Sequence, residues 1–270
     1  MNVSNKVIVI TGAASGIGAA MARRFVSEGA RALVLGDVQD DALQVFGNDL
    51  ISSAGVQPGQ CAVVCQRCDV TREADIQALV DTAVQRFGQV DVYCSNAGLV
   101  RDGDENAPDA QWTLNWNLHV MASVWAARAV VPGMRLRGEG YFLITASAAG
   151  LLSSLPSSTY AVTKHAAIAL AEKLAIDHGG AGVRVSVLCP QAVDTPLMAG
   201  RLGKGAALDG VASADEVAEL VVKGMQAERF LILPHPQVLD YFRNKATDYD
   251  RWLGGMRKMA ARLAQAANAQ

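Results

Sequence analysis

Short apolar runs rich in Val, Ile and Leu alternate along this chain with longer segments in which apolar residues recur at helical spacing. Seven such runs predict strands, over residues 7–10, 32–35, 62–65, 90–95, 141–146, 183–188 and 230–233. The segments between them predict helices over residues 16–28, 39–53, 72–87, 109–131, 158–178 and 214–227. This alternation is typical of repeated βαβ units. We therefore expect an α/β fold with a mainly parallel seven-stranded sheet and helices on both faces.

The composition and layout of the chain fit one such sheet. Its 270 residues are 51% hydrophobic but only 6% aromatic, which favours the aliphatic core of a parallel sheet covered on both sides. No Pro-, Gly- or Ser-rich linker and no repeat divides the sequence, so we expect residues 1–270 to form a single domain. The longest weakly structured stretches, residues 98–108 and 195–213, follow predicted strand ends. Open α/β sheets bind their ligands at such ends.

Charge and residue usage exclude several classes of function. The 24 basic and 26 acidic side chains nearly cancel and form no basic block, so no nucleic-acid partner is expected. The apolar run at residues 7–10 is too short for a secretion signal or a membrane span, and we expect a cytoplasmic protein without membrane attachment. Five cysteines, an odd number, favour reduced thiols. The four histidines show no ligand spacing, so no metal site is expected.

Three of the cysteines have a spacing that suggests a second interpretation. Cys61, Cys65 and Cys68 form the pattern C-x3-C-x2-C, which resembles the cluster-binding segment of radical SAM enzymes. Residues 62–64, however, are expected to form a buried strand, where cysteine is an ordinary small apolar residue. An extended backbone spaces these thiols along a line rather than around one iron–sulfur cluster, so we do not expect a cluster.

A glycine-rich turn lies between the first predicted strand and the first predicted helix. Gly12, Gly16 and Gly18 follow the spacing G-x3-G-x-G, with Ser15 and Ile17 among them. Glycine allows a tight turn whose backbone N–H groups approach a pyrophosphate at the start of a helix. A tight connection without a ligand is the other interpretation of such a turn.

An acidic residue at the end of the second predicted strand strengthens the nucleotide interpretation. Asp37 follows Gly18 by 19 residues, close to the spacing of about 20 at which a carboxylate binds the ribose hydroxyls of a dinucleotide. It would repel a 2′-phosphate, and neither Ser15 nor Val38 supplies a cation for one. The sequence therefore favours NAD over NADP. The alternative for Asp37 is a solvated loop residue or a helix N-cap.

A tyrosine and a lysine open the helix predicted at residues 158–178. Tyr160 and Lys164 stand four residues apart, so their side chains lie on one helix face. A tyrosine with an ordinary pKa of about 10 is a poor base at neutral pH. A nearby ammonium lowers the pKa of the phenol and makes it a usable acid and base. Two exposed helix residues are the other interpretation of this pair.

Together, these elements resemble the conventional branch of the short-chain dehydrogenase/reductase family over roughly residues 5–235. Further matches are Ser147, 13 residues before Tyr160, and the motifs Asp69-Val70 and Asn96-Ala97-Gly98. The resemblance implies a Rossmann-type, doubly wound sheet and a nicotinamide cofactor. In that family the residues equivalent to Asp69 contact the adenine ring, those equivalent to Asn96-Ala97-Gly98 line the cofactor site, and those equivalent to Pro190, Val193 and Thr195 meet the nicotinamide carboxamide.

The resemblance also implies a mechanism in which hydride moves between a substrate carbon and the nicotinamide. Tyr160 would exchange the proton of the reacting oxygen, Ser147 would polarise that oxygen, and Lys164 would also bind the nicotinamide ribose. Asn117 is similar to the family's helix asparagine, whose backbone carbonyl holds a water in the proton relay. Asn115 is the competing position, but the residues that follow fit the family better for Asn117.

Two features depart from the family pattern. Gln191 stands where the family has glycine after Pro190, and it either contacts the substrate or points outward. The chain also continues with an extension over residues 236–270, in which apolar residues such as Trp252 and Met256 recur at helical spacing. This helical extension is expected to pack on its own domain or on a neighbouring subunit. The alternative is that it closes the substrate pocket of its own or a partner subunit.

We therefore expect an NAD-linked oxidoreductase that acts on a small apolar secondary alcohol or the matching ketone. Residues 195–200 are a candidate lid, and the pocket is expected to be apolar because the strand-end loops carry Leu99, Val100, Leu151, Leu152, Leu197 and Met198. One alternative is an NADPH-dependent reductase of 3-oxoacyl thioesters, and another is a non-catalytic NAD(H)-sensing binding protein. Family members usually pair through the helices equivalent to 109–131 and 158–178, so a homodimer or homotetramer is expected.

Overall fold

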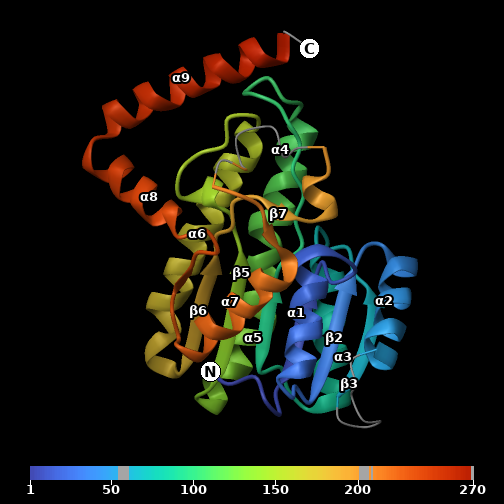
Figure 1. Ribbon diagram of the computed structural model, residues 1–270. Helices are drawn as coiled ribbons and strands as arrows, with labels where there is room; N and C mark the ends of the chain where they lie inside the picture. The colour runs from blue at the N-terminus through green and yellow to red at the C-terminus, as the bar shows by residue number, and fades with distance from the viewer. Residues whose placement is uncertain (54–60, 201–206, 208, 269–270) are drawn as a thin grey trace.

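The computed structural model of the protein describes residues 1–53, 61–200, 207 and 209–268. Its main sheet contains β1 (Val7–Thr11), β2 (Ala32–Asp37), β3 (Ala62–Arg67), β4 (Val92–Ser95), β5 (Gly140–Thr145), β6 (Val183–Leu188) and β9 (Leu231–Ile232). Within the described residues, these seven strands lie parallel in the order β3-β2-β1-β4-β5-β6-β9. The order reverses between β1 and β4, and helices cover both faces (Figure 1). The expected doubly wound, Rossmann-type α/β fold is confirmed.

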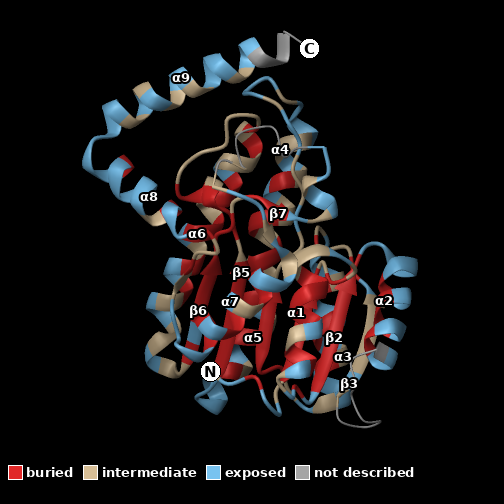
Figure 2. Ribbon diagram, viewed as in Figure 1, coloured by how far each residue is buried: buried red, intermediate tan, exposed pale blue. Residues whose placement is uncertain are grey.

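An apolar layer covers each face of the sheet. One layer is formed by α1 (Gly16–Ser27), α2 (Asp40–Ser53) and α7 (Ala214–Gln226), and the other by α3 (Glu73–Phe87), α5 (Ala122–Arg137) and α6 (Ser158–His178). Successive residues of a strand point to opposite faces, so Ile8 of β1 joins the first layer and Val9 the second. The strands at the centre are consequently buried on both sides (Figure 2).

The expectation of a buried strand at residues 62–64 is wrong. β3 lies at the edge of the sheet, and its residues are exposed or half-buried because, in the described part of the chain, β2 is its only neighbour in the sheet. All five cysteines are free. Burial raises the pKa of Cys61 to about 11 and that of Cys68 to about 12, so both thiols are protonated at neutral pH.

The helix expected over residues 109–131 is interrupted and ends later than predicted. α4 (Asp109–Trp116) is followed by a π-helical turn, η1 (Asn117–Met121), and α5 then continues to Arg137. The end expected at residue 131 is wrong because Pro132, which has no backbone N–H to donate, lies inside α5. Turns of the π type are frequent at functional sites.

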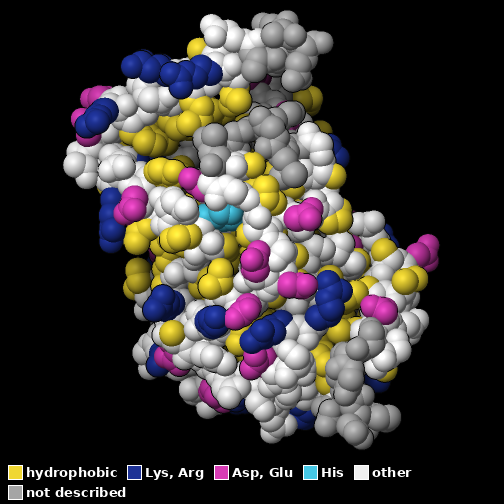
Figure 3. Space-filling model, in the orientation of Figure 1, with side chains coloured by type: hydrophobic (Ala, Val, Ile, Leu, Met, Phe, Trp, Pro, Cys, Tyr) yellow, Lys and Arg dark blue, Asp and Glu magenta, His cyan; other side chains and the backbone are white. Residues whose placement is uncertain are grey.

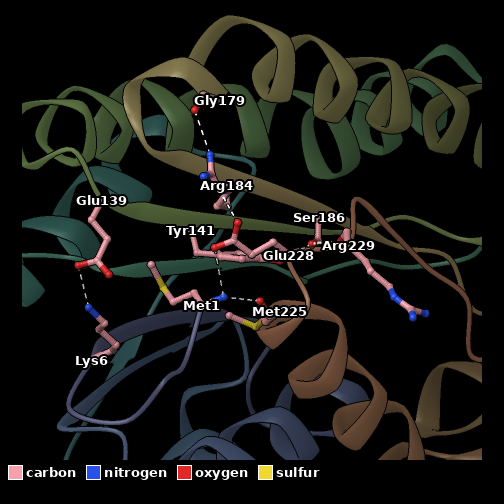
Figure 4. A network of polar contacts seen from close by, with 10 residues as sticks. All are labelled: Met1, Lys6, Glu139, Tyr141, Gly179, Arg184, Ser186, Met225, Glu228 and Arg229. Carbon is pink, nitrogen blue, oxygen red and sulfur yellow. Dashed lines mark hydrogen bonds and ion pairs between the residues drawn. The ribbon is translucent and has the colours of Figure 1, made fainter.

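A polar network connects the amino ends of β5 and β6 (Figure 4). Glu228 pairs with Arg184 of β6 at 2.6 Å and with the Met1 amino group at 3.7 Å. Beside this pair, the hydroxyls of Tyr141 and Ser186 hydrogen-bond at 2.5 Å. These contacts stabilise the amino ends of β5 and β6. The loops that follow the strands lie at the opposite, carboxyl ends.

The loops after β6 carry the remaining short elements. Two-residue strands, β7 (Val193–Asp194) and β8 (Ala212–Ser213), pair with each other, and the turn η4 (Pro196–Met198) follows β7. Residues 195–213 were expected to be weakly structured. Of these, residues 201–206 and 208 lie outside the described residues.

Two helices follow the last strand of the sheet. α8 (Gln237–Thr247) begins beside the sheet layers, where Val238 is fully buried, and α9 (Tyr249–Asn268) crosses above the carboxyl ends of the strands (Figure 1). α9 packs chiefly on α8. Among the helices of the described residues, none is long and apolar enough to cross a membrane.

Candidate active site

A cavity of about 1210 Å³ opens where the parallel strands end. Many residues that the sequence singles out line it, namely Gly12, Ser15, Gly16, Ile17, Asp37, Asp69, Val70, Asn96, Ala97, Gly98, Ser147, Tyr160, Lys164, Pro190, Val193 and Thr195. Gly18 and Asn117 are not part of its wall. One cavity therefore brings together the residues expected to hold a nucleotide and those expected to carry the chemistry.

The glycine turn is packed too tightly for side chains. A Cβ atom at Gly12 would lie 2.7 Å from the Ala97 Cα, and one at Gly18 would lie 2.1 Å from the Gly12 carbonyl oxygen. Gly12 and Gly16 also adopt φ angles of 66° and 54°, which favour glycine. Because α1 begins at Gly16, beside the cavity, its unpaired N–H groups are available to a pyrophosphate. The turn therefore fits a dinucleotide.

Two carboxylates line the cavity next to this turn. Asp37 accepts the Ala14 N–H through Oδ2 and the Gln39 N–H through Oδ1, both at 3.0 Å. Asp37 is buried and α2 begins three residues later, so it is neither the solvated loop residue nor the helix N-cap of the alternative interpretation. Each of its oxygens keeps a lone pair for a further donor. Asp69 accepts the N–H of Thr71 at 3.0 Å and its hydroxyl at 2.7 Å, which orders the loop after β3.

Asn96 connects the ends of three strands. Its Nδ2 donates to the carbonyl oxygens of Thr11 at 3.0 Å and Gly12 at 3.2 Å, at the end of β1. Its Oδ1 accepts the Thr145 hydroxyl at 3.0 Å, at the end of β5, while Asn96 itself follows β4. This amide therefore holds together the carboxyl ends of β1, β4 and β5, which border the cavity.

Ser147 and Tyr160 are each positioned by a cap. Ser147 caps the short 3-10 turn η2 (Ala148–Gly150): its Oγ accepts the Ala149 N–H at 3.1 Å and donates to the Pro190 carbonyl at 3.4 Å. Ser157 caps α6 and accepts the Tyr160 N–H at 3.2 Å, which places Tyr160 in the first turn of that helix. Both side chains consequently reach the cavity from rigid elements.

Lys164 lies one helical turn after Tyr160 and is buried. Its Nζ donates to the Thr145 carbonyl at 2.8 Å and lies 5.5 Å from the centre of the Tyr160 ring. Burial lowers the pKa of Lys164 to about 8. Burial also raises the pKa of Tyr160, and the Ser147 hydroxyl beside it acts in the opposite direction.

The expectation that Lys164 lowers the pKa of Tyr160 is therefore not met in this structure. The ammonium is directed at a backbone carbonyl, and the cost of burying a phenolate outweighs the other influences on the tyrosine. At neutral pH Tyr160 is consequently a phenol and Lys164 is a cation.

His119 lies beside this pair, although the sequence analysis considered it only as a metal ligand. Its ring meets the Tyr160 ring edge to face, with centroids 5.5 Å apart. Thr163 donates its hydroxyl to the Thr159 carbonyl at 2.8 Å and therefore accepts the Nδ1 proton of His119, also at 2.8 Å. Burial and the Lys164 charge hold the pKa of His119 well below its ordinary value, so the ring is neutral. The sequence could have indicated that His119 lies near the site, because it follows Asn117 by only two residues.

The two candidate asparagines lie in different surroundings. Asn117 opens the π-helical turn η1, and its carbonyl accepts the Ala122 N–H. Asn115 is fully buried, and its Nδ2 donates to the Gln111 carbonyl at 2.9 Å. The role of Asn117 in a proton relay stays a prediction.

Gln191 lines the cavity next to Pro190. Its backbone N–H donates to His235 Nδ1 at 3.2 Å, and its side-chain Oε1 is buried without a hydrogen-bond partner among the described residues. Of the two interpretations of Gln191, the structure favours the one in which it meets a ligand.

The remaining wall of the cavity is largely apolar. It includes most of the predicted loop residues, namely Leu99, Val100, Leu152, Leu197 and Met198, whereas Leu151 is buried behind it. The structure adds a set from α8 and α9 whose contribution the sequence left open: Tyr241, Asn244, Thr247, Asp248, Arg251, Trp252, Gly255, Met256 and Met259. The geometry therefore agrees with the alternative in which the C-terminal extension closes the substrate pocket.

Known sequences are related to this chain over most of its length. The sequence model of the short chain dehydrogenase family matches residues 6–204. Among individual proteins, the chain is 36% identical over 253 residues to the 1-deoxy-11-beta-hydroxypentalenate dehydrogenase of Streptomyces exfoliatus. That alignment covers 92% of this chain and 90% of the Streptomyces protein.

Solved structures with the same fold contain nicotinamide cofactors. A short chain dehydrogenase/reductase from Burkholderia phymatum in complex with NAD has a TM-score of 0.82 and 32% identity, with 93% of this chain and 96% of that chain covered. L-sorbose reductase from Gluconobacter frateurii, complexed with NADPH and L-sorbose, has a TM-score of 0.76 and 30% identity, with 86% and 97% covered. These similarities support a nicotinamide dinucleotide as cofactor.

Proposed function

This chain belongs to the short chain dehydrogenase family, and from that premise we propose that it transfers a hydride between NAD(H) and a secondary alcohol or the matching ketone. The observation that carries the proposal is a single cavity bordered by the glycine turn and Asp37 on one side and by Ser147, Tyr160 and Lys164 on the other. The remainder of its wall carries more apolar than polar surface, which suits a substrate that is chiefly apolar.

Each polar group of the reaction centre has a distinct role in the proposal. The nicotinamide dinucleotide, when bound, supplies or accepts the hydride. In ketone reduction Tyr160 donates its phenolic proton to the carbonyl oxygen, and in alcohol oxidation the phenolate takes that proton back. Ser147 donates a hydrogen bond to the reacting oxygen, where negative charge develops. Lys164 would hydrogen-bond the nicotinamide ribose through its ammonium group, as the family resemblance implies.

The titration behaviour of the pair is consistent with these roles. Because the pKa of Tyr160 is raised, the resting enzyme holds the phenol, which is the acid that ketone reduction needs. Lys164, with a pKa of about 8, is charged at neutral pH. Alcohol oxidation needs the phenolate, so it is favoured by alkaline conditions.

A test of the chemistry compares the wild type with Tyr160→Phe on a panel of secondary alcohols. We expect NADH production by the wild type and a loss in kcat of about 100-fold or more in the variant, the usual contribution of a positioned acid or base. NADH binding, followed by fluorescence, serves as the control and should stay the same. Equal rates in both proteins would contradict the role of Tyr160. Tight NADH binding without turnover of any alcohol or ketone would instead favour an NAD(H)-sensing protein.

The choice of NAD over NADP is supported by the surroundings of Asp37. Its carboxylate repels a 2′-phosphate, and the basic residues of the described cavity wall, Arg101, Lys164 and Arg251, follow β4 or lie on α6 and α9. None of the three belongs to the β1–β2 side of the cavity.

The cofactor preference is tested with the double variant Asp37→Ser/Val38→Arg. We expect the ratio of kcat/KM for NADH to kcat/KM for NADPH to fall by about 100-fold, since a repulsive charge is replaced by an attractive one next to the ribose. Val38→Arg alone should lower this ratio less than the double variant does. A wild type that prefers NADPH would contradict the assignment of NAD as cofactor. It would favour the alternative function, a reductase of 3-oxoacyl thioesters.

A further inference from the structure

Lys245, near the end of α8, is a buried ammonium that the proposed chemistry does not use. Only 6% of its surface is exposed. Its Nζ donates to the carbonyls of Leu151 at 2.8 Å and Leu152 at 2.7 Å, and it lies 3.4 Å from His165 Nε2. His165 donates its Nδ1 proton to the Ala161 carbonyl at 2.8 Å, so Nε2 is an acceptor. Each of the three ammonium hydrogens therefore has its own acceptor.

These acceptors belong to the segments that carry the reaction centre. Leu151 and Leu152 directly follow η2, the turn that Ser147 caps, and Leu152 lines the cavity. His165 follows Lys164 on α6. Hydrogen bonds to a charged donor are stronger than those between neutral groups. Lys245 therefore attaches α8 to both segments at one point.

The same ammonium lies against the first turn of α9. Its Nζ is 4.8 Å from the centre of the Trp252 ring and 5.5 Å from that of Tyr249, within the range of cation–π attraction. The two rings meet edge to face, with centroids 5.7 Å apart. Lys245 consequently sets both the position of α8 and the direction in which α9 leaves it.

From this anchor α9 extends along the cavity. Arg251, Trp252, Gly255, Met256 and Met259 line the cavity from α9, and their spacing places them on one face of the helix. Figure 3 shows basic side chains along the outer edge of α9 and hydrophobic ones beneath them, toward the body of the protein. The helix thus turns a mainly apolar face to the cavity, with the exposed Arg251 near its start, and a charged face to water.

We propose that Lys245 is a positioning residue of the substrate site: it holds residues 237–259 as a roof over the cavity, and the roof selects secondary alcohols that carry a bulky apolar group. The inference rests on the proposed hydride transfer. Trp252, Met256 and Met259 remove such a group from water, whereas a small alcohol leaves this part of the cavity unfilled. The roof therefore acts on KM for the bulky substrate and leaves the hydride step unchanged.

Two neighbouring glycines of α9 allow a matched test of the roof. Gly254 and Gly255 both have no atom within 4 Å of an added Cβ, but only Gly255 lines the cavity. The substrates are decahydro-2-naphthol, which is bulky, and cyclohexanol, which is small. We expect Gly255→Leu to raise KM for decahydro-2-naphthol at least tenfold without changing kcat/KM for cyclohexanol. Gly254→Leu should change neither.

The anchor itself is tested with Lys245→Met, which keeps most of the length of the side chain and removes its three donors. We expect KM for decahydro-2-naphthol to rise at least tenfold, with kcat for cyclohexanol and the affinity for NADH unchanged. Trypsin should also cut α9 faster. Arg243→Met is the control, because Arg243 is an exposed basic residue of the same helix that pairs only with the neighbouring Asp240 among the described residues.

The outcomes separate this inference from the proposed function. Equal effects of Gly254→Leu and Gly255→Leu on the two alcohols would overturn the roof, even if the enzyme oxidises both. Loss of cyclohexanol oxidation in Lys245→Met with an unchanged preference between the alcohols would overturn the anchor. If neither alcohol is oxidised by the wild type, the proposed function fails, and calorimetric binding of decahydro-2-naphthol to the two glycine variants still decides whether the roof binds apolar groups.

Discussion

At the scale of single residues, Lys164 is subject to two opposing requirements. The proposed chemistry needs its ammonium group at the cofactor ribose, yet the protein buries that charge and gives it one backbone carbonyl as partner. Burial lowers the pKa of Lys164 from 10.5 to about 8, so below pH 8 the folded state carries the full cost of the buried cation. A catalytic group that destabilises its own fold is the expected signature of a functional site.

This cost predicts how stability depends on pH. As pH rises from 8 toward 10.5, the folded state releases the Lys164 proton before the unfolded state does, so the penalty disappears. Compared with Lys164→Met, the wild type should therefore gain about 2 kcal/mol in its free energy of unfolding between pH 7 and pH 10. Urea unfolding of both proteins at the two pH values measures the difference. A constant difference across this range would show that Lys164 does not titrate with a lowered pKa.

At the scale of elements, the first turn of α1 packs so closely on the glycine turn before it that Gly18 has no room for a methyl group. A Cβ at Gly18 would lie 2.1 Å from the Gly12 carbonyl oxygen and 2.7 Å from Asn96 Nδ2, so Gly18→Ala must displace the turn. We expect the variant to lose about 2 kcal/mol of stability and at least tenfold in NADH affinity. Urea unfolding and NADH fluorescence titration are the measurements.

The same substitution in another helix provides the comparison. Gly254→Ala places its methyl group in open space within α9, where alanine is favoured over glycine by about 0.5–1 kcal/mol. It should therefore be neutral or stabilising and should not change NADH binding. Similar losses in the two variants would mean that the close packing around Gly18 is not what matters.

The elements also show what a sequence can and cannot predict. The strand at residues 183–188 and the helix at 158–178 agree with the structure residue for residue, because their patterns and end signals are local. The helix predicted to end at residue 131 instead continues through Pro132, because a local pattern does not record whether the folded protein tolerates a proline inside a helix.

The candidate site divides in the same way. The glycine turn, Asp37 and the Tyr160–Lys164 pair could be found because each lies in a short motif at a strand end or helix start. The contact of Lys245 with Leu151 spans 94 residues, and that of His119 with Thr163 spans 44. Such pairs depend on how helices pack, which no local pattern records.

At the scale of the whole molecule, the exposed apolar residues of α4 and α6 support self-association. Trp116, Val162 and Ile176 are 44%, 49% and 76% exposed, on the helices through which the family resemblance implies pairing. We expect light scattering to give two or four times the chain mass of 28.4 kDa. Val162→Lys/Ile176→Lys should lower that mass, whereas Val45→Lys, at an exposed site on α2 and away from both helices, should not. A wild type that remains monomeric at high concentration would contradict the expected pairing.

The placement of α8 and α9 has a consequence for how this chain can change. The described strands of the main sheet and the residues of the reaction centre all precede residue 237, and the family match ends at residue 204. Val238 and Lys245 are two of the side chains through which the roof meets that framework. Mutations in the codons for residues 237–259 can therefore change substrate selectivity without altering the residues of the reaction centre. Selectivity and chemistry can evolve separately in such a chain.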